Sequence, residues 1–530
     1  MKKYFNFKFL ESIILSPFVF AVQPILQLFA LNFEEVTFND VLRPVLIALL
    51  LALLLVGIFF LVLRSWVKAG LIVAMFFPLF FAFGSIAQWV ETKTGLTVLR
   101  SNVLVLAALF VLLVLWFLTV TRWARGLGSI NLYFNVISIL FILNPAWQLA
   151  GGLFHGGVSF ESAKPSVTMT STSNDLPDVY YIILDAYGRQ DILQEYYNYD
   201  NSGFINGLKE RGFYVAEQSS SNYIQTALSL SSSLNMNYVQ TLVAKDSSLK
   251  NRFALIDMIH HSEVRRILAE QGYQLVSFQN DYKVAVPDAE VFYDDSVKGW
   301  THPITAFEGI LIEQSMTRVL LSFPAFNNFV IEAPYKTHRD EILAAFKGLQ
   351  GIPSLDGNYF VYAHIIAPHP PFVFGPNGEI MPHDEPFTLF DANYFIRDHS
   401  RRAYITGYKR QIEYINKLMM QAVDQILAKS KTPPIIIIQG DHGPGAYLHW
   451  GSLDNSIPQE RFGMLNAYYF PKQNYKLLYP SISPVNSFRV VLDEYFGQKF
   501  ELLPDKHYFS GWGTPFDFIE VDGKILTHAK

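Results

Sequence analysis

Residues 434–445 read PIIIIQGDHGPG. A short run of isoleucines bounded by turn residues is typical of a strand that is buried on both faces of a sheet. The run ends at Gly440, and Asp441 and His442 follow at once. Burying a carboxylate at the end of a core strand costs free energy unless the group is paired or bound to a metal. This stretch therefore predicts a buried parallel strand with reactive groups at its carboxyl end.

Three other runs have the same apolar character and predict further strands. They are residues 178–185 (DVYYIILD), 273–278 (YQLVSF) and 359–366 (YFVYAHII). Helical patterns, such as those of residues 262–271 and 404–429, alternate with them. This alternation indicates an α/β domain with a mostly parallel central sheet that helices cover on both faces. Ligands of such sheets bind beyond the carboxyl ends of the strands.

Polar residues stand at these strand ends. Asp185 ends the first strand, and His369 follows the third in the string APHPPF. Together with Asp441 and His442 they would gather carboxylates and imidazoles at one sheet edge. Oxygen and nitrogen donors without sulfur suit a divalent cation such as Zn²⁺ or Mn²⁺. For Asp185 the alternative is a helix cap or a turn former.

Two further histidines have open roles. His364 lies within the third strand, and His449 follows the DHGPG string. Either could be a hydrogen-bonded core or surface histidine. Either could also contribute to a second metal ion, which the sequence does not assign.

Hydroxyl groups are concentrated in residues 219–235, SSSNYIQTALSLSSSLN. The segment begins as a loop and turns helical near Ala227, so Thr226 stands where a helix begins. Backbone N–H groups at that end would face an anion. A hydroxyl bound to a divalent cation is readily deprotonated and becomes a nucleophile. The residues alone do not distinguish Thr226 from Ser221 or Ser229 as that nucleophile.

The N-terminal part is far more apolar than the rest, in a chain of 530 residues that is 51% hydrophobic and 16% charged. Each of its long apolar runs approaches the ~20 residues that cross a bilayer as a helix. A buried soluble helix could explain one run, but a succession of them indicates membrane spans. A cleavable signal peptide is not evident. The five runs are residues 9–31, 45–63, 69–90, 103–120 and 130–149.

The loops between these runs predict the orientation. Cations cluster at the N-terminus and in the second and fourth loops, which would share one side of the membrane. That side is therefore expected to be cytoplasmic, and an odd number of spans puts the remaining chain outside. Polar residues inside the last run are attributed to packing. The clustered cations are Lys2, Lys3, Lys8, Arg64, Lys68, Arg122 and Arg125.

We therefore expect a transmembrane domain at residues 1–150, a Gly-, Ser- and Thr-rich linker at 151–176, and a catalytic domain at 177–530. The net charge of −5 gives no argument for nucleic-acid binding. The chain has no cysteine, which excludes disulfides, thiolate metal sites and a cysteine nucleophile.

The order of motifs resembles the alkaline phosphatase and sulfatase superfamily. The resemblance is carried by Asp185, the NYIQT string with Thr226, the PHPPF string with His369, and GDHG with Asp441 and His442. Five spans before an external domain look like the architecture of lipoteichoic acid synthases and phosphoethanolamine transferases. The resemblance thus implies an alkaline phosphatase-like fold with a membrane anchor.

The resemblance also implies roles for individual residues. Asp185, Thr226, Asp441 and His442 would ligate one divalent metal ion, and Thr226 would be the nucleophile. Lipoteichoic acid synthases have a glutamate in the place of Asp185, whereas sulfatases and phosphatases have aspartate. The substrate-binding set would comprise His369 near the substrate phosphate, Asn222 in the loop that shapes the site, and His364 and His449.

Some features depart from these families. The Cys/Ser-x-Pro-x-Arg motif that sulfatases convert to formylglycine does not follow Asp185. The segment after Tyr273 lacks the Trp and Arg string that lipoteichoic acid synthases use near glycerol phosphate. The resemblance therefore leaves the transferred group open between phosphoethanolamine and phosphoglycerol.

The expected function is transfer of a phospho-head group from a membrane phospholipid to a glycolipid or surface polysaccharide through a phospho-threonine intermediate. A phosphodiesterase, phosphatase or sulfatase-like hydrolase would use the same site with water as acceptor. A non-catalytic membrane protein that binds a glycan is a third interpretation. In each case the expected location is the cell (inner) membrane, with a periplasmic or extracellular C-terminal domain.

Overall fold

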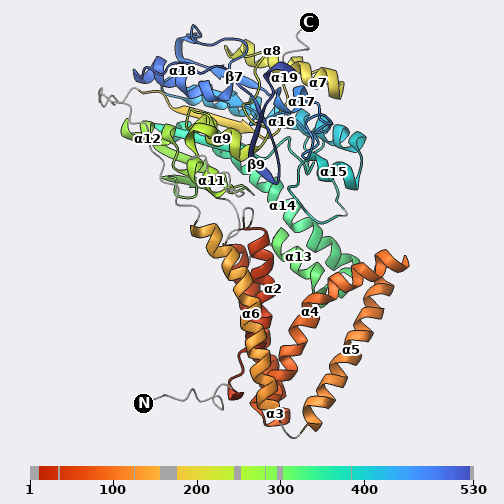
Figure 1. The fold of residues 1–530 in the computed structure, drawn as a ribbon. Helices are drawn as coiled ribbons and strands as arrows, with labels where there is room; N and C mark the ends of the chain where they lie inside the picture. The colour runs from red at the N-terminus through yellow and green to blue at the C-terminus, as the bar shows by residue number, and fades with distance from the viewer. Residues whose placement is uncertain are drawn as a thin grey trace, which may run out of the picture. The chain divides into compact units, whose positions relative to one another are not determined.

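A computed structural model divides the chain into two compact units (Figure 1). The first, here called the membrane unit, comprises Met1–Phe154, Val297–Pro334 and His383–Phe387. The second, the catalytic unit, comprises His155–Ser296, Tyr335–Pro382 and Thr388–Lys530. Two pieces of the predicted catalytic domain therefore belong to the membrane unit. The structure describes residues 11–33, 36, 38–123, 126–154, 176–243, 252–280, 282–294, 303–383 and 385–525.

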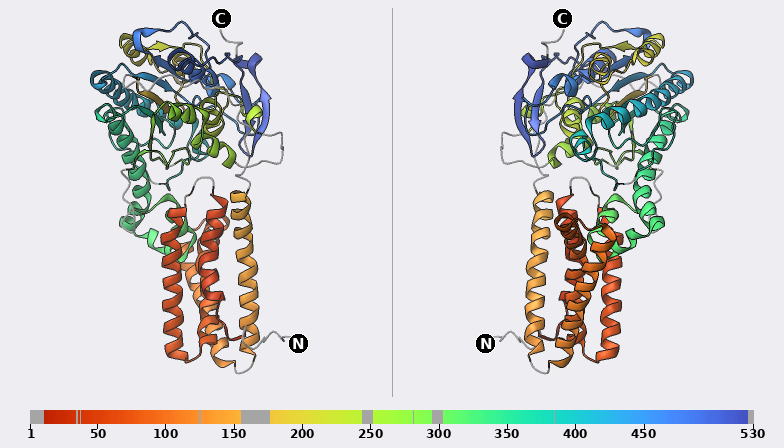
Figure 2. Two further views of the ribbon diagram at one scale, coloured as in Figure 1. Left: turned by 90° about the vertical axis from the view of Figure 1, so that its left-hand side faces the viewer. Right: turned by 90° about the vertical axis from the view of Figure 1, so that its right-hand side faces the viewer.

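The membrane unit is a bundle of apolar helices that run alongside one another (Figure 2). Four helices in the described part are long and apolar enough to cross a membrane. The first predicted run forms the shorter α2, whose 16 residues rise only about 24 Å. Five spanning helices are therefore not confirmed. Residues 9–10 of the first predicted run and residues 155–175 of the predicted linker lie outside the described residues. The helices are α2 (Ser16–Leu31), α3 (Phe38–Leu63), α4 (Trp66–Thr94), α5 (Val98–Arg122) and α6 (Leu127–Phe154).

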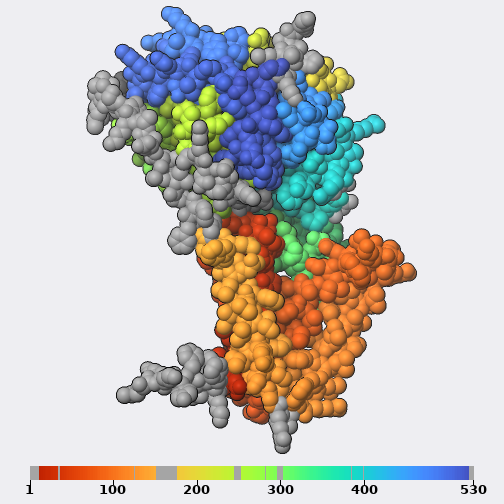
Figure 3. Space-filling model, in the orientation of Figure 1, coloured from red at the N-terminus to blue at the C-terminus, as the bar shows by residue number. Residues whose placement is uncertain are grey.

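Large apolar side chains cover the outside of this bundle. Leu50 is 60% exposed, Phe110 65% and Trp147 81%. The last two belong to α5 and α6, whose orange surfaces face the viewer in Figure 3. A water-soluble protein rarely exposes so continuous an apolar surface. The bundle therefore has the surface of a protein that is embedded in lipid.

Polar side chains inside the bundle form hydrogen bonds with backbone groups where the helix is interrupted, just before α2. Pro17 stands in the first turn of α2 and follows residues 13–15, which are not helical. The Oδ1 atom of Asn135 accepts hydrogen bonds from the backbone N–H groups of Leu15 and Ser16, at 3.1 and 2.9 Å. Asn131 donates to the carbonyl of Ile13 at 2.6 Å. Such partners are required where water cannot reach freed backbone groups, which agrees with the packing role expected for these residues.

A segment from the second half of the sequence packs into the same unit. It contains α13 (Ala306–Gln314), the 3₁₀ helix η1 (Met316–Ser322) and the start of α14 (Pro324–Leu349). Phe307 and Leu311 of α13 join the apolar core formed by α2, α3 and α4.

Two largely buried ion pairs join this inserted segment to the helices of the bundle. Arg43 of α3 pairs with Glu308 through an Nε–Oε1 contact of 2.6 Å. Arg318 of η1 pairs with Glu91 of α4 at 2.9 Å. Breaking a buried pair by removing one partner leaves an uncompensated charge, so these contacts specify where the segment docks.

The catalytic unit is built on a seven-stranded sheet of order β2-β7-β6-β1-β5-β3-β4. Neighbouring strands from β6 to β4 are parallel, and β7 is antiparallel to both β6 and β2. The four predicted strands are confirmed, with bounds that agree to within one residue. The two predicted helices are confirmed, with bounds that agree to within three residues. The strands are β1 (Val179–Leu184), β2 (Tyr214–Val215), β3 (Gln274–Phe278), β4 (Val291–Tyr293), β5 (Tyr359–Ile365), β6 (Ile435–Gln439) and β7 (Asn466–Tyr469).

Helices cover the sheet because both of its faces are apolar. Tyr181 and Ile183 of β1 join one core with side chains of α9, α11, α12 and α18. Their neighbours Ile182 and Leu184 point to the opposite face and are also fully buried. The remaining elements are α7 (Gln190–Tyr197), α8 (Ser202–Glu210), α9 (Thr226–Leu234), α10 (Val239–Leu242), α11 (Phe253–His260), α12 (Glu263–Glu270), η2 (Ile352–Ser354), α15 (Ala392–Asp398), α16 (Arg401–Lys429), α17 (Pro458–Phe462), η3 (Pro471–Gln473), α18 (Pro484–Phe496), α19 (Asp522–Ile525) and the hairpin β8 (Tyr508–Gly511) and β9 (Thr514–Glu520).

The contact between α13 and α4 predicts that Gly84 is indispensable. A Cβ atom at Gly84 would lie 2.1 Å from the carbonyl oxygen of Glu313. Gly84→Leu should therefore displace α13 and destabilise the membrane unit by about 1–3 kcal/mol, the usual cost of overpacking. Thermal unfolding in detergent would measure this as a lower Tm. Gly57→Leu is the matched control, because nothing lies within 4 Å of a Cβ there; equal Tm values for the two variants would contradict the proposed packing.

Candidate active site

Strand register brings the predicted residues to one edge of the sheet. In β1, Ile183 lies opposite His364 of β5 on one side and Gln439 of β6 on the other. Side chains alternate along a strand, so residues two positions further on share that face. Asp185 and Asp441 are these residues; Asp185 directly follows β1, and Asp441 follows β6 after Gly440.

Each of the two carboxylates has one oxygen fixed by the protein. Asp441 Oδ1 accepts hydrogen bonds from the N–H groups of Ala186 and His442, at 3.1 and 3.0 Å. Asp185 Oδ2 lies 3.1 Å from His364 Nε2. The other two oxygens, Asp185 Oδ1 and Asp441 Oδ2, are buried and have no hydrogen-bond partner among the described residues. Orphaned carboxylate oxygens of this kind call for a cation.

His442 is oriented toward these free oxygens. Its Nδ1 lies 2.9 Å from the carbonyl oxygen of Gly443, so that nitrogen donates a proton and leaves the lone pair on Nε2. Nε2 lies 3.2 Å from Asp441 Oδ2 and 3.9 Å from Asp185 Oδ1. Burial, together with the guanidinium of Arg461, lowers the pKa of His442. The ring is therefore neutral at neutral pH, as a metal ligand must be.

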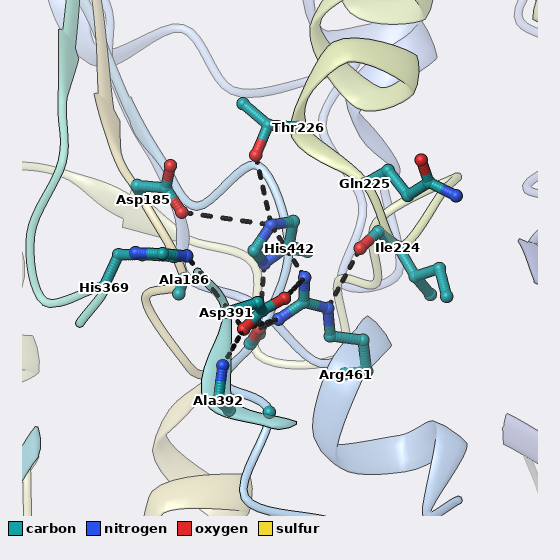
Figure 4. A network of polar contacts seen from close by, with 12 residues as sticks. Asp185, Ala186, Ile224, Gln225, Thr226, His369, Asp391, Ala392, His442 and Arg461 are labelled. Atoms are coloured by element: carbon teal, nitrogen blue, oxygen red, sulfur yellow. Dashed lines mark hydrogen bonds and ion pairs between the residues drawn. The ribbon is translucent and has the colours of Figure 1, made fainter. Parts of the chain in front are cut away.

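Thr226 completes the group, as Figure 4 shows. Its Oγ1 lies 3.3 Å from His442 Nε2. Thr226 is the first residue of α9, and the first intrahelical bond runs from Ser229 to Gln225, so the N–H groups before it are available to an anion. The alternative nucleophiles, Ser221 and Ser229, both donate instead to the carbonyl of Tyr223. Of the three hydroxyls, Thr226 is the one that meets His442.

The donor set fits a divalent metal ion. Ligand atoms of Asp185, His364 and Asp441 lie within 4.8 Å of one another. Burial opposes ionisation of Asp185, but His369, His364 and His442 outweigh it and hold its pKa below the ordinary value. The site therefore presents an ionised carboxylate together with the Nε2 lone pair of His442. This oxygen and nitrogen chemistry agrees with the sequence-based expectation of Zn²⁺ or Mn²⁺.

The four residues predicted as substrate contacts differ in their surroundings. The side chain of His364 is 0% exposed and bonded to Asp185, so it orients that carboxylate, and its substrate contact stays a prediction. The same holds for Asn222, whose amide bonds to Ser483, Lys506 and Val485 and thereby fixes the loop before Thr226.

The other two substrate contacts likewise stay predictions. His369 borders the site: among its neighbours it lowers the pKa of Asp185 most, and its Nε2 lies 4.0 Å from Asp391 Oδ1. His449 is exposed in the loop after β6, and its backbone is bonded to Ser452 and Ser456.

Sequence reasoning missed Arg461 and Asp391. Arg461 Nη2 lies 2.6 Å from Asp391 Oδ2 and 3.1 Å from His442 Nε2, while its Nε donates to the carbonyl of Ile224. Arg461 is 2% exposed, so its charge needs the neighbouring carboxylate. Both residues lie outside the strand-end pattern, and no local signal marks a fully buried arginine.

Close packing leaves no room for a side chain at the last glycine of GDHG. A Cβ atom at Gly443 would lie 2.1 Å from the carbonyl oxygen of Glu460. Glu460 in turn accepts hydrogen bonds from the N–H groups of Ala446 and Tyr447, both at 2.8 Å. This contact holds the loop that leaves His442.

Comparison with known proteins identifies the family. The model of the family described as Sulfatase matches residues 177–487, more than half of the chain. The chain belongs to the sulfatase family. As a sulfatase-family protein it is an enzyme, and the matched region contains every residue of the group around His442. No curated protein sequence matches this sulfatase-family protein.

Solved structures with a similar fold include three bacterial proteins. The C-terminal periplasmic domain of EptC from Escherichia coli is 10% identical, with a TM-score of 0.41 over 68% of this chain and 97% of that one. Lipooligosaccharide phosphoethanolamine transferase A from Neisseria meningitidis is 12% identical, with a TM-score of 0.39 over 92% and 93%. The lipoteichoic acid synthase LtaP from Listeria monocytogenes is 10% identical, with a TM-score of 0.36 over 68% and 84%.

The orphaned oxygens predict how metal content responds to mutation. Asp441→Asn removes a negative donor next to His442 Nε2, so bound Zn²⁺ or Mn²⁺ per protein should fall at least tenfold. Elemental analysis after dialysis would measure it. Asp178→Asn is the control, because Asp178 precedes β1 at the other end of the strand and accepts a bond from Tyr359. Unchanged metal content in Asp441→Asn would contradict the assignment.

Glu460 predicts a pH dependence of stability. Burial raises its pKa from 4.5 to about 7. The folded state then holds this proton at a pH where the unfolded state has lost it, so the contribution is complete below pH 4.5 and is lost as the pH rises through 7. The difference corresponds to about 3 kcal/mol. The Tm of Glu460→Gln should therefore fall less between pH 5 and pH 8 than that of the parent; parallel Tm profiles would contradict this.

Proposed function

We propose that this protein transfers the phosphate-bearing head group of a membrane phospholipid, phosphoethanolamine or phosphoglycerol, to a glycolipid or surface polysaccharide. The observation that carries the proposal is the position of Thr226. Its hydroxyl stands at a helix N-terminus and meets His442 beside two orphaned carboxylate oxygens. A nucleophile, an anion-binding helix end and cation donors thus converge on one point.

Asp185, Thr226, Asp441 and His442 would hold a divalent ion, Zn²⁺ or Mn²⁺. When bound, that ion would lower the pKa of the Thr226 hydroxyl and offset negative charge on the phosphate oxygens. His364 keeps Asp185 in place through the 3.1 Å contact. Thr226 is 8% exposed, more than Asp185 or His442, so its hydroxyl is the member of the set that a substrate would reach.

In the first step, Thr226 Oγ1 forms a bond to phosphorus while the bond from phosphorus to the diacylglycerol oxygen breaks. The threonine proton is lost, and the leaving oxygen takes up a proton. The free N–H groups at the start of α9 would bind the phosphate oxygens, and His369 would contact the same phosphate. In the second step, an acceptor hydroxyl attacks phosphorus, loses its proton, and releases Thr226.

The membrane unit supports a lipid donor, because its apolar helices would hold the enzyme where phospholipids are concentrated. We propose that it lies in the cell (inner) membrane with a cytoplasmic N-terminus and a periplasmic or extracellular catalytic unit, as the loop cations indicate. The chain lacks a cysteine and the formylglycine motif after Asp185, which favours threonine-based phosphoryl transfer over sulfate-ester hydrolysis.

The test uses purified full-length protein, a phospholipid labelled in its head group, and membrane glycans. The parent should form a labelled adduct on Thr226 and pass the label to the glycan. Thr226→Ala should lose at least 10³-fold in rate, because the nucleophile is absent, and mass spectrometry should find no adduct. Ser231→Ala is the matched control, since its hydroxyl lies in the same helix and donates only to Leu228.

Full activity of Thr226→Ala would contradict the proposed nucleophile. Release of the free head-group phosphate at full rate without glycan would instead show a hydrolase. Labelled glycan appearing only in the presence of the parent and of Ser231→Ala supports transfer.

A further inference from the structure

The membrane unit contains a cavity of about 380 Å³ that the reaction at Thr226 does not use. Its walls come from the start of α5, from α13 and η1, from the first turns of α14, and from Pro386 and Phe387. All of these segments belong to the membrane unit. A cavity of this size suits a lipid head group or another small molecule.

Chain direction locates the cavity at one end of the bundle. The helices α4, α5 and α6 run in alternating directions, so the end of α4, the start of α5 and the end of α6 share one end. Val98 and Leu99, the first residues of α5, line the cavity. The cavity thus lies at the end of the bundle where α4 and α6 end and α5 begins.

The side chains around this boundary are exposed and apolar. Leu99 is 57% exposed, Phe323 at the end of η1 61%, and Phe329 in α14 55%. Exposure of such side chains to water is unfavourable, whereas contact with acyl chains is not. The surroundings of the cavity are therefore suited to the part of a lipid just below its head group.

The charges in the cavity are not balanced. Arg318 is already neutralised, because its Nη1 lies 2.9 Å from Glu91 Oε1 and 2.9 Å from Asn102 Oδ1. Glu313 also lines the cavity, and within the described part of the chain no hydrogen bond holds its carboxylate. Burial, reinforced by Glu91, raises its pKa even though Arg318 opposes the effect. The lining thus offers one carboxylate, and the cation that acts on it, Arg318, is already paired with Glu91.

A second polar group in the lining is also unsatisfied. Ser322 Oγ is buried and has no hydrogen-bond partner among the residues described. A ligand with an ammonium group for Glu313 and an ester or phosphate oxygen for Ser322 would satisfy both. A single carboxylate is too small a donor set for a metal ion, so a cation attached to an apolar molecule fits better.

We propose that this cavity binds the head group of an amine-bearing phospholipid, with the ammonium group on Glu313 and the acyl chains over Leu99, Phe323 and Phe329. The lipid would fill the space between α5 and the inserted segment of α13 and η1. This site is separate from the group around His442 and does not depend on the proposed transfer reaction.

The experiment measures lipid binding to full-length, delipidated protein by native mass spectrometry. The probes are dioctanoyl phosphatidylethanolamine, dioctanoyl phosphatidylglycerol and glycerophosphoethanolamine, which has the amine but no chains. The parent should bind the phosphatidylethanolamine at least tenfold more tightly than either other probe. Glu313→Gln should lose that preference, and Glu332→Gln, an acid of α14 outside the lining, should keep it.

A second variant fills the cavity without disturbing its walls. A Cβ atom at Gly309 would meet only Val330 Cγ1, at 4.0 Å. Gly309→Leu should abolish binding of both lipids and keep the parent's Tm, since leucine favours a helix over glycine. Equal binding of the two lipids by the parent, or parental binding by Gly309→Leu, would overturn the proposal. Equally tight binding of glycerophosphoethanolamine would overturn it too, by showing a water-soluble occupant.

Discussion

Asp185 and Asp441 are buried carboxylates, and within the described part of the chain only one oxygen of each is hydrogen-bonded. Isolated buried charge is so costly that a protein tolerates it only where a cation or histidines compensate it. Much of the catalytic unit serves this arrangement. The register of β6, β1 and β5 sets the two carboxylates side by side, and His364 fixes Oδ2 of Asp185. The two remaining oxygens, Asp185 Oδ1 and Asp441 Oδ2, thereby form a candidate binding site for a divalent ion.

His442 links this site to a second set of charges. Its Nε2 is close to Thr226 Oγ1, Asp441 Oδ2 and the guanidinium of Arg461. Arg461 forms an ion pair with Asp391, so the positive charge of its guanidinium is neutralised without a substrate. Such preorganised charges cost no rearrangement during a reaction. Burial and the charge of Arg461 lower the pKa of His442, and the bond from Nδ1 to Gly443 directs the Nε2 lone pair toward the carboxylates.

In the membrane unit, too, polar and charged groups away from water are paired. Asn131 and Asn135 pair with the backbone where the chain breaks before α2, and Arg43 and Arg318 each meet an acid. The two arginine pairs bind a segment that comes from beyond residue 297. The catalytic chain therefore returns to the membrane unit, and α14 leads back out of it. The two units are joined by several passages of the chain as well as by the segment after α6.

The sequence by itself determined the features that have a local cause. Isoleucine and tyrosine runs specify β1, β5 and β6, and the acids at their ends mark the reactive edge, because strand patterning and the position of strand ends are readable along the chain. Only the tertiary structure decided which of Thr226, Ser221 and Ser229 lies next to His442, the support of Asp185 by His364, and the presence of Arg461 and Asp391. These depend on contacts between residues far apart in the chain. The sequence did not reveal the inserted segment for the same reason. α13 has the length and composition of a soluble helix, and it packs against α4 because Gly84, far away in the sequence, leaves room for it.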